Sequence, residues 1–418
     1  MMRSVSCVLC LVCGCGRIGF DAVATDGAAG DGAPEPVGQL DPTFATTGYA
    51  LTSSLTSFAA YDLLERTGAG YLLVGPHAVG GSSFGLFAYA ADGSVDASFG
   101  TGGIVDIGPT TSDFAYSAVR LSDGRILVSG DGDAATGTAD DITMGVIDEA
   151  GVPDPAFGSG GFVRLDVLGG MLADTSGRSI QVGMSSLIAC GASNYPVTDS
   201  HFVLANVSLT GNLIPSFGTN GMVVEDFHPG VHDGCNDLVA LPDGTIVAVG
   251  STGPSALATA YRLDGTRDPT FAGGVPLEIG TNAGFEGISR APDGDLVVSG
   301  QDNGSGTVGM LSPAGVPRAG FGQAGFARLP SALFLTGNVV QPDGKVVAVG
   351  QSQAQNAMFA RFRIDGSLDP SFGTGGIVEL PLGVKGQLVS VILTGDGKLV
   401  AAGFLGGGPY RGLVVRLL

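Results

Sequence analysis

A unit of some fifty to sixty residues recurs seven times along the chain, and this repeat limits the possible folds more than any other feature. One landmark is a Phe in a DPSFG-like segment. The spacing between successive copies ranges from 50 residues (Phe271 to Phe321) to 60 residues (Phe157 to Phe217). The complete set is Phe44, Phe99, Phe157, Phe217, Phe271, Phe321 and Phe372. A second landmark is the Gly that closes a short apolar run, at Gly75, Gly130, Gly191, Gly250, Gly300, Gly350 and Gly403. Two independent landmarks with the same count indicate a real repeat.

Each unit is predicted to consist of β-strands. Runs such as RILVSG and KVVAVG are short, β-branched and bounded by turn residues. An Asp-Gly pair before most of them is typical of a tight hairpin turn, because Gly accepts the positive φ that the turn requires. The second unit is predicted to contain strands at 116–121, 125–130, 142–148 and 161–166. The 72 glycines and 22 prolines argue against long helices.

Four strands per unit of this length are the size of a propeller blade. The last unit ends with its third strand, LVVRLL, and lacks a fourth. Residues 40–52 contain a strand of the fourth type, with no first, second or third strand of the same unit before it. We therefore predict an all-β, seven-bladed β-propeller with four antiparallel strands per blade, in which residues 48–52 join the C-terminal blade and close the ring. The alternative is an open solenoid with frayed ends.

Two segments of the sixth unit, Asp369–Gly376 (DPSFGTGG) and Gln341–Gly350 (QPDGKVVAVG), resemble the delta-60 repeat family. The resemblance extends over about residues 40–418, with the third unit and the segment after Arg318 most divergent. It implies a β-propeller and a bacterial surface or secreted protein. It implies no established activity and no catalytic residues.

The N-terminus is predicted to direct export. Residues 1–15 have a basic start, an apolar stretch too short to span a bilayer, and a lipobox-like end at Cys15, the predicted lipidation site. Residues 16–39 are small, acidic and proline-containing, as in a flexible linker, and residues 40–418 form the propeller. We expect an outer-membrane lipoprotein or secreted protein of the cell envelope, with a lipid anchor to the membrane. A signal that is simply cleaved and an uncleaved apolar N-terminus are the alternatives.

The formal net charge of −20 argues against nucleic acid as a partner, and suits solubility or cationic partners. Beyond the leader the chain has two cysteines, Cys190 and Cys235. Both are predicted near the axis of neighbouring blades on the same face. They form either a disulfide, which an oxidising compartment permits, or two buried thiols.

Function is predicted on one face of the ring. The connections from second to third strand and from fourth strand to the next blade share that face and vary between units, which is where propellers place binding groups. Three loops are candidates. Residues 191–201 offer a ligand contact through Tyr195, Asp199 and His201. Residues 225–237 offer a ligand or Zn²⁺ site through Asp226, His228, His232, Asp233 and Cys235, or are an ordinary polar loop. Residues 131–141 offer a Ca²⁺ site through Asp131, Asp133, Asp140 and Asp141, or are simply solvated.

The sequence contains no HExxH motif and no P-loop, and no residue is predicted to be catalytic. The favoured hypothesis is a non-enzymatic binding module that meets an envelope or extracellular protein or glycan through the variable face, with no cofactor required. The alternative is a hydrolase or lyase acting on a polysaccharide or lactone, with carboxylates or Ca²⁺ at the channel mouth. A purely structural envelope role is a third hypothesis.

Overall fold

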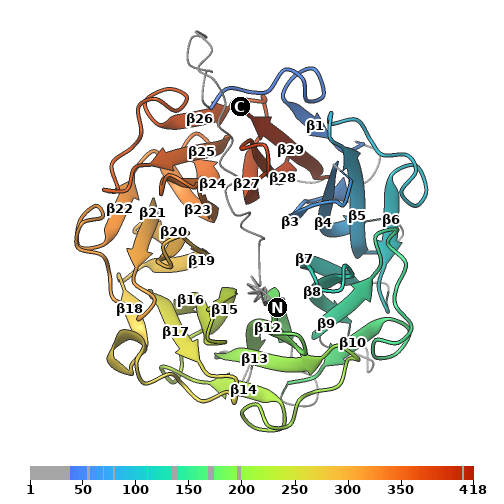
Figure 1. Cartoon of the computed structure of the whole chain (residues 1–418), viewed down its shortest axis with the longest axis vertical. Coiled ribbons are helices and arrows are strands. Elements are labelled where there is room, and N and C mark those ends of the chain that lie inside the picture. Colours follow the sequence, from blue (N-terminus) through green and yellow to red (C-terminus); the bar gives the residue numbers. More distant parts are fainter. Residues whose placement is uncertain are drawn as a thin grey trace, which may run out of the picture.

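The strands of the protein form seven sheets arranged in a ring around a central axis (Figure 1). The structure is a computed structural model that describes residues 38–53, 57–68, 70–78, 81–110, 112–133, 140–167, 174–194, 199–406 and 409–418. The predicted leader, Cys15 and nearly all of the linker lie outside the described residues. Within them, no helix has the length and apolar character needed to cross a membrane.

The first three blades hold the strands from β2 to β14. Blade 1 contains β2 (Ser57–Phe58), β3 (Asp62–Glu65), β4 (Gly70–Ala78), β5 (Ser83–Ala90) and β6 (Ile104–Ile107). Blade 2 contains β7 (Asp113–Arg120), β8 (Ile126–Asp133), β9 (Asp140–Ile147) and β10 (Phe162–Leu165). Blade 3 contains β11 (Asp174–Val182), β12 (Ser186–Asn194), β13 (Ser200–Ser208) and β14 (Met222–Glu225).

The next three blades hold the strands from β15 to β26. Blade 4 contains β15 (Asp233–Ala240), β16 (Ile246–Thr252), β17 (Ser255–Tyr261) and β18 (Leu277–Ile279), with the 3-10 turn η1 (Phe271–Gly273) before β18. Blade 5 contains β19 (Ala283–Arg290), β20 (Leu296–Asp302), β21 (Ser305–Leu311) and β22 (Phe326–Leu329). Blade 6 contains β23 (Ala332–Val340), β24 (Val346–Ser352), β25 (Ala357–Phe362) and β26 (Ile377–Leu380).

The seventh blade joins the two ends of the described chain. It contains β27 (Gly386–Leu393), β28 (Leu399–Leu405), β29 (Arg411–Leu417) and, as its outer strand, β1 (Tyr49–Leu51). Tyr49 pairs with Val415 and Leu51 with Leu413. This confirms the predicted ring of seven four-stranded antiparallel blades and its closure by the N-terminal strand, and it excludes the open solenoid. In blade 1, β2 and β3 both pair with β4 and together take the place of the innermost strand.

The DPSFG landmark is a turn whose Asp, Arg and Phe support one another. In blade 6, Asp369 accepts hydrogen bonds from the backbone N–H of Ser371 (3.1 Å) and from its hydroxyl (2.7 Å). Arg361 forms an ion pair with Asp369 (2.9 Å) and lies over the ring of Phe372, 4.7 Å from its centroid. Phe372 is fully buried. The recurrence of Asp and Phe therefore has a structural cause in turn formation and packing.

The Asp-Gly pair after the third strand links each blade to the one before it. Gly366 has a φ of +79°, and a Cβ there would lie 2.5 Å from the backbone nitrogen of Gly322 in blade 5. The same Gly322 N–H donates to the carbonyl of Asp365 (2.8 Å). Glycine is needed at 366 both for its backbone conformation and for this close approach.

The second landmark, the Gly that closes the apolar run, also marks a close backbone contact. A β-bulge in the innermost strand brings a backbone carbonyl close to this Gly. A Cβ on Gly350 would lie 2.1 Å from the carbonyl oxygen of Phe334. A Cβ on Gly130 would lie 1.8 Å from the carbonyl oxygen of Phe114. No other residue type fits without moving the backbone.

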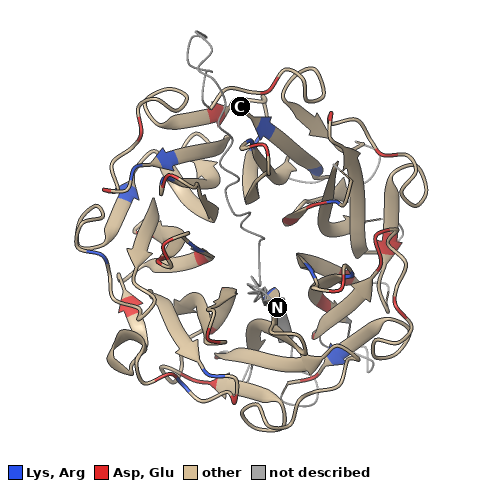
Figure 2. Ribbon diagram, viewed as in Figure 1, with Lys and Arg blue, Asp and Glu red and all other residues tan. Residues whose placement is uncertain are grey.

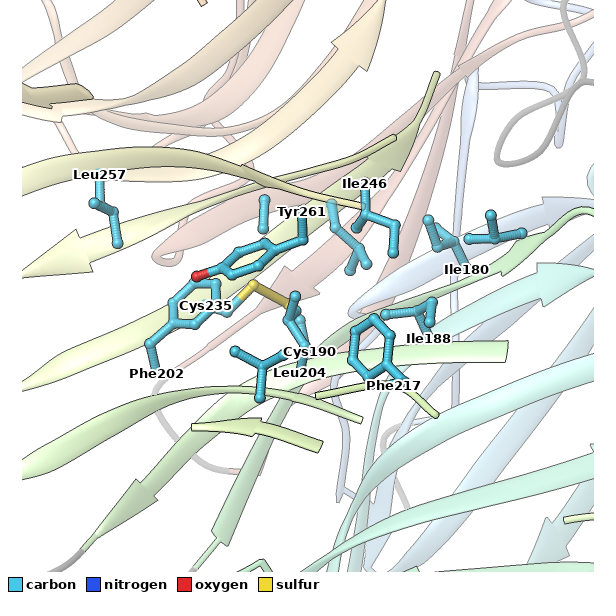
Figure 3. Packing of buried hydrophobic residues seen from close by; sticks show 14 residues of the cluster. Ile180, Ile188, Cys190, Phe202, Leu204, Phe217, Cys235, Ile246, Leu257 and Tyr261 are labelled. Atoms are coloured by element: carbon cyan, nitrogen blue, oxygen red, sulfur yellow. A yellow bond between two sulfur atoms is a disulfide. The ribbon is translucent and has the colours of Figure 1, made fainter. Parts of the chain in front are cut away.

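Among the described residues, the hydrophobic core forms seven clusters, one at each junction between neighbouring blades. Figure 3 shows the cluster between blades 3 and 4, where Phe202 and Leu204 pack against Tyr261 and Ile246 around a disulfide. Each blade buries its two faces against two neighbours, which is why a closed ring suits this sequence.

The connections between second and third strands share a face with the connections that enter each blade. In blade 4 the N–H of Gly253 donates to the carbonyl of His232 (2.8 Å), and in blade 5 the N–H of Asn303 donates to the carbonyl of Asn282 (2.8 Å). Neighbouring blades are joined in the same way, through Ala283 N–H and the Pro254 carbonyl (2.8 Å). We call this face the variable-loop face. It carries the two kinds of connection that were predicted to share one face.

Candidate functional site

The innermost strands of the blades surround the central axis (Figure 1), and at one position in each of them the residue type varies widely. Register shifts at this point occur in the inner strands of blades 2 to 7. The residues are Tyr61, Tyr116, Arg178, Asn236, Glu286, Thr336 and Val389. Several contact the inner strand of the next blade: Asn236 Nδ2 donates to the carbonyl of Phe285 (2.9 Å), and Thr336 Oγ1 to that of Leu388 (2.6 Å).

Charged residues of both signs lie on the strands around the axis (Figure 2). Arg178 of blade 3 forms ion pairs with Asp62 of blade 1 (2.7 Å) and Asp237 of blade 4 (3.7 Å). Burial opposes its positive charge, but the two carboxylates outweigh burial and raise the pKa of Arg178 above its ordinary value.

The two carboxylates at the axis have further structural partners. Asp62 accepts from the backbone N–H of Ala118 (3.0 Å) in blade 2 and from the Ser390 hydroxyl (2.7 Å) in blade 7. Asp237 accepts from the backbone N–H of Ile288 (2.9 Å) in blade 5. These residues therefore hold inner strands together across the axis, rather than converging on open space.

Four aromatic side chains from three blades gather at the variable-loop end of the inner strands. The ring centroids of Tyr61 and Tyr116 are 5.3 Å apart, those of Tyr61 and Phe404 5.8 Å, and those of Phe404 and Tyr410 5.1 Å. Tyr410 is 38% exposed and the other three are partly buried. We call Tyr61, Tyr116, Phe404 and Tyr410 the aromatic group. It presents apolar ring surface next to polar phenol groups.

The aromatic group is held in place by blade 1. The backbone N–H of Tyr410 donates to the Ser57 hydroxyl (2.9 Å), and its carbonyl accepts from the Phe58 N–H (3.0 Å). Burial raises the pKa of Tyr61, and the nearby ionisable groups of Tyr410 and Asp131 raise it further. Tyr61 therefore presents a neutral phenol at physiological pH.

Sequence reasoning did not identify the aromatic group, because its members are far apart in the chain. A signal was present nonetheless: the bulge residue stands 14 positions before the landmark Gly, as from Tyr61 to Gly75 and from Tyr116 to Gly130. In blade 3 the residue at this position is Gly177, and Arg178 follows it.

The described residues of the predicted carboxylate loop, 131–133 and 140–141, belong to strands. β8 extends to Asp133 and β9 begins at Asp140, so both strands are longer than predicted. Asp131 pairs with Ile142 and Gly132 with Asp141, and the side chains of Asp131 and Asp141 are buried. The longer ladder satisfies backbone groups that a solvated loop would expose. The side chains of Asp133 and Asp140 lie outside the described residues, and Ca²⁺ at these carboxylates stays a prediction.

The candidates at 225–237 do not come together as one group. His228 is exposed and contacts Glu278 (3.0 Å), whose hydrogen bond and charge raise the pKa of His228. His232 Nδ1 lies 3.2 Å from the Ser200 hydroxyl. Asp233 is buried and accepts from the Phe227 N–H (2.6 Å), and burial raises its pKa.

The structure joins Cys190 of β12 and Cys235 of β15 in a disulfide, with the Cα atoms 5.5 Å apart (Figure 3). Of the two interpretations left open by the sequence, the structure thus contains the disulfide between blades 3 and 4. Cys235 is consequently not available as a thiolate ligand beside His232.

Residues from two of the predicted loops lie close together in blade 3. One ligand atom each from Asp199, His201 and Asp226 lies within 4.8 Å of the others. Tyr195, the remaining candidate of the 191–201 loop, lies outside the described residues.

A serine-centred GxSxG pattern at 81–85 leads into β5 of a β-hairpin rather than forming a strand-to-helix turn. The Ser83 hydroxyl donates to Asp106 Oδ1 (3.1 Å) and to the carbonyl of His77 (3.4 Å), and His77 Nδ1 lies 2.7 Å from Asp106 Oδ1. Since the hydroxyl contacts the carboxylate and not the imidazole, these groups lack the geometry of a serine nucleophile with a histidine base.

Residues 341–372 match a family model described as "Domain of unknown function (DUF5122) beta-propeller". The seven blades define the chain as a β-propeller, and the matched segment lies within one of its repeats, in blade 6. No curated protein sequence matches it.

Among solved structures, the WD40 β-propeller domain of Doa1 is similar, with 13% identity and a TM-score of 0.47 over 88% of this chain and 97% of that one. Virginiamycin B lyase from Staphylococcus aureus is similar with 10% identity and a TM-score of 0.46 over 88% and 99%. At these values neither likeness indicates a ligand or substrate.

Proposed function

We propose that the protein is a non-enzymatic binding module whose variable-loop face binds an extracellular or envelope glycan, with a protein segment as the second candidate. The aromatic group is the observation that carries this proposal. Its phenols accept and donate hydrogen bonds, while its rings offer apolar surface for the C–H faces of a sugar or for an apolar side chain. The hydrogen bonds of Tyr410 to Ser57 and Phe58 fix one side of the group before a ligand arrives, which lowers the cost of binding.

The arrangement of carboxylates favours binding over the hydrolase or lyase alternative. That alternative needs acidic groups directed at a substrate. At the axis, Asp62 and Asp237 instead bond Arg178 and backbone N–H groups of neighbouring blades.

The test is binding of neutral and basic polysaccharide fractions and of envelope proteins to the purified chain, measured by calorimetry. Tyr61→Ala and Tyr410→Ala should each weaken binding by about 5-fold or more, taking as the scale the roughly 1–3 kcal/mol that a base stacked on an aromatic side chain contributes. The matched control is Ile364→Ala, which removes an exposed apolar side chain (67% exposed) from the opposite face, where the connections between third and fourth strands lie. Equal effects of all three variants, or none, would refute the proposal.

The same proposal places the propeller outside the cytoplasm, tethered through Cys15, as in proteins of delta-60 type. The disulfide between Cys190 and Cys235 supports export, because such bonds persist mainly in oxidising compartments. Labelling of cells with a tagged fatty acid should modify the chain, and Cys15→Ser should abolish the label. Retention of the label in that variant would contradict the assignment.

A further inference from the structure

A second group of side chains on the variable-loop face, Asp199, His201 and Asp226, lies in blade 3. The register of two strands brings these residues together. The last pair of β13 and β14 is Phe202 with Glu225. The next facing positions along the two strands are His201 and Asp226. Asp199 stands two residues before His201, so both point to the same side of an extended chain. This explains why their ligand atoms lie within 4.8 Å of one another.

Asp199 has a feature that turn formation does not explain. Its side chain is only 7% exposed, and Oδ2 accepts a hydrogen bond from the Gly230 N–H (2.9 Å). Its other oxygen, Oδ1, is buried and has no hydrogen-bond partner. A buried carboxylate oxygen without a partner costs free energy unless a cation or donor meets it. A metal ion bound by this oxygen would supply that partner.

The segment that carries Asp199 and His201 is anchored to the next blade. Ser200 lies between them; its hydroxyl donates to the carbonyl of Asp233 (3.0 Å) and lies 3.2 Å from His232 Nδ1. Ser200 and His232 also form a parallel bridge. These contacts orient the flanking side chains before any ligand binds, as the supporting residues of metal sites do.

We propose that Asp199, His201 and Asp226 form a binding site for a divalent transition-metal ion, with Zn²⁺ as the best match. One imidazole and two carboxylates are a ligand set for zinc with a fourth position open, whereas Ca²⁺ takes oxygen ligands alone. In a tetrahedral zinc site, two ligands each about 2.1 Å from the ion lie about 3.4 Å apart. The three ligand atoms lie within 4.8 Å of one another, so the most distant pair needs to close by up to about 1.4 Å.

The test uses the full chain without a polyhistidine tag, with free thiols alkylated so that the leader cysteines bind no metal. Calorimetric titration with ZnCl₂ at neutral pH should show one site per chain, and titrations with CaCl₂ and MgCl₂ should show none of comparable affinity. His201→Ala should reduce Zn²⁺ affinity more than about 100-fold, since even the loss of a supporting residue costs about 10–100-fold.

Two further variants keep the test decisive. Asp226→Asn changes an exposed side chain, so it should fold normally and still lose most of the Zn²⁺ affinity. His228→Ala removes an exposed histidine two residues away and should leave binding unchanged. Absence of Zn²⁺ binding in the parent protein, equal binding of Ca²⁺, or loss of binding in His228→Ala but not in Asp226→Asn would each overturn the proposal. None of these outcomes depends on whether the aromatic group binds a ligand.

Discussion

Replacing Asp41 by Asn should open the ring at the junction between β1 and β29. Asp41 is fully buried, and its carboxylate bonds Arg416 Nε of β29 (2.8 Å) and Lys398 Nζ (3.0 Å). Arg416 in turn lies over the ring of Phe44 at 4.8 Å. The N-terminal segment is thus attached to the last blade by a buried ion pair as well as by the three residue pairs between β1 and β29.

The magnitude follows from what the substitution leaves behind. An Asn at 41 can still accept from Thr43, but it presents an N–H₂ group to one of the two basic side chains. Lys398 is 28% exposed and can turn to solvent, so its contact counts for little. Arg416 is only 8% exposed and loses its counter-charge. Removing one partner of such a buried pair costs about 3–5 kcal/mol.

This loss should appear first as local opening. Limited proteolysis followed by mass spectrometry should show new cleavage within residues 38–52 of Asp41→Asn, at denaturant concentrations where the parent protein is uncut. Urea unfolding should give the reduction in unfolding free energy.

The matched control is Asp369→Asn, because Asp369 has the same place in the motif within an interior blade and pairs with Arg361. It should lower stability without new cleavage near the N-terminus. The reasoning is refuted if Asp41→Asn loses less than about 1 kcal/mol, or if the control exposes residues 38–52 equally.

Three other perturbations have defined outcomes. Replacing both Cys190 and Cys235 by Ala should lower the unfolding free energy by about 4 kcal/mol on the chain-entropy model for a 45-residue separation, and urea titration showing less than 1 kcal/mol would contradict it. Burial opposes ionisation of Asp369, but hydrogen bonds from Ser371 and the charges of Arg361 and Lys345 hold its pKa at about 2. Its stabilising contribution is therefore present above about pH 4 and lost as pH falls toward 2, and the acid-induced fall should be shallower in Asp369→Asn. Arg178→Met should lower the unfolding free energy by about 3–5 kcal/mol, because it removes the positive charge that Asp62 and Asp237 share; urea unfolding that shows less than about 1 kcal/mol would contradict this.

The repeat was sufficient to predict the blade count, the closure and the variable-loop face. The landmarks Phe372, Gly366 and Gly350 are set by local geometry that every blade must reproduce, so they recur visibly in sequence. Strand bounds in blade 2 were less predictable, because the ladder between β8 and β9 continues into polar residues that resemble a loop.

The candidate sites were only partly predictable. Asp199, His201 and Asp226 were all candidates, but they were assigned to two separate loops, since only the register of β13 and β14 reveals that they face one another. The aromatic group and the ion pairs of Arg178 join blades that are distant in the chain. Contacts of this kind depend on which side chains meet around the axis, and no local pattern encodes them.

The pairing of β1 with β29 also has a consequence for the order of events during synthesis. Tyr49 leaves the ribosome hundreds of residues before Val415, its partner, so the first strand must wait unpaired while the intervening blades form. An exposed strand edge is a hazard for aggregation during such a delay. At three residues, β1 is short enough to offer a poor template to other chains, yet it still completes the sheet when the last strand arrives.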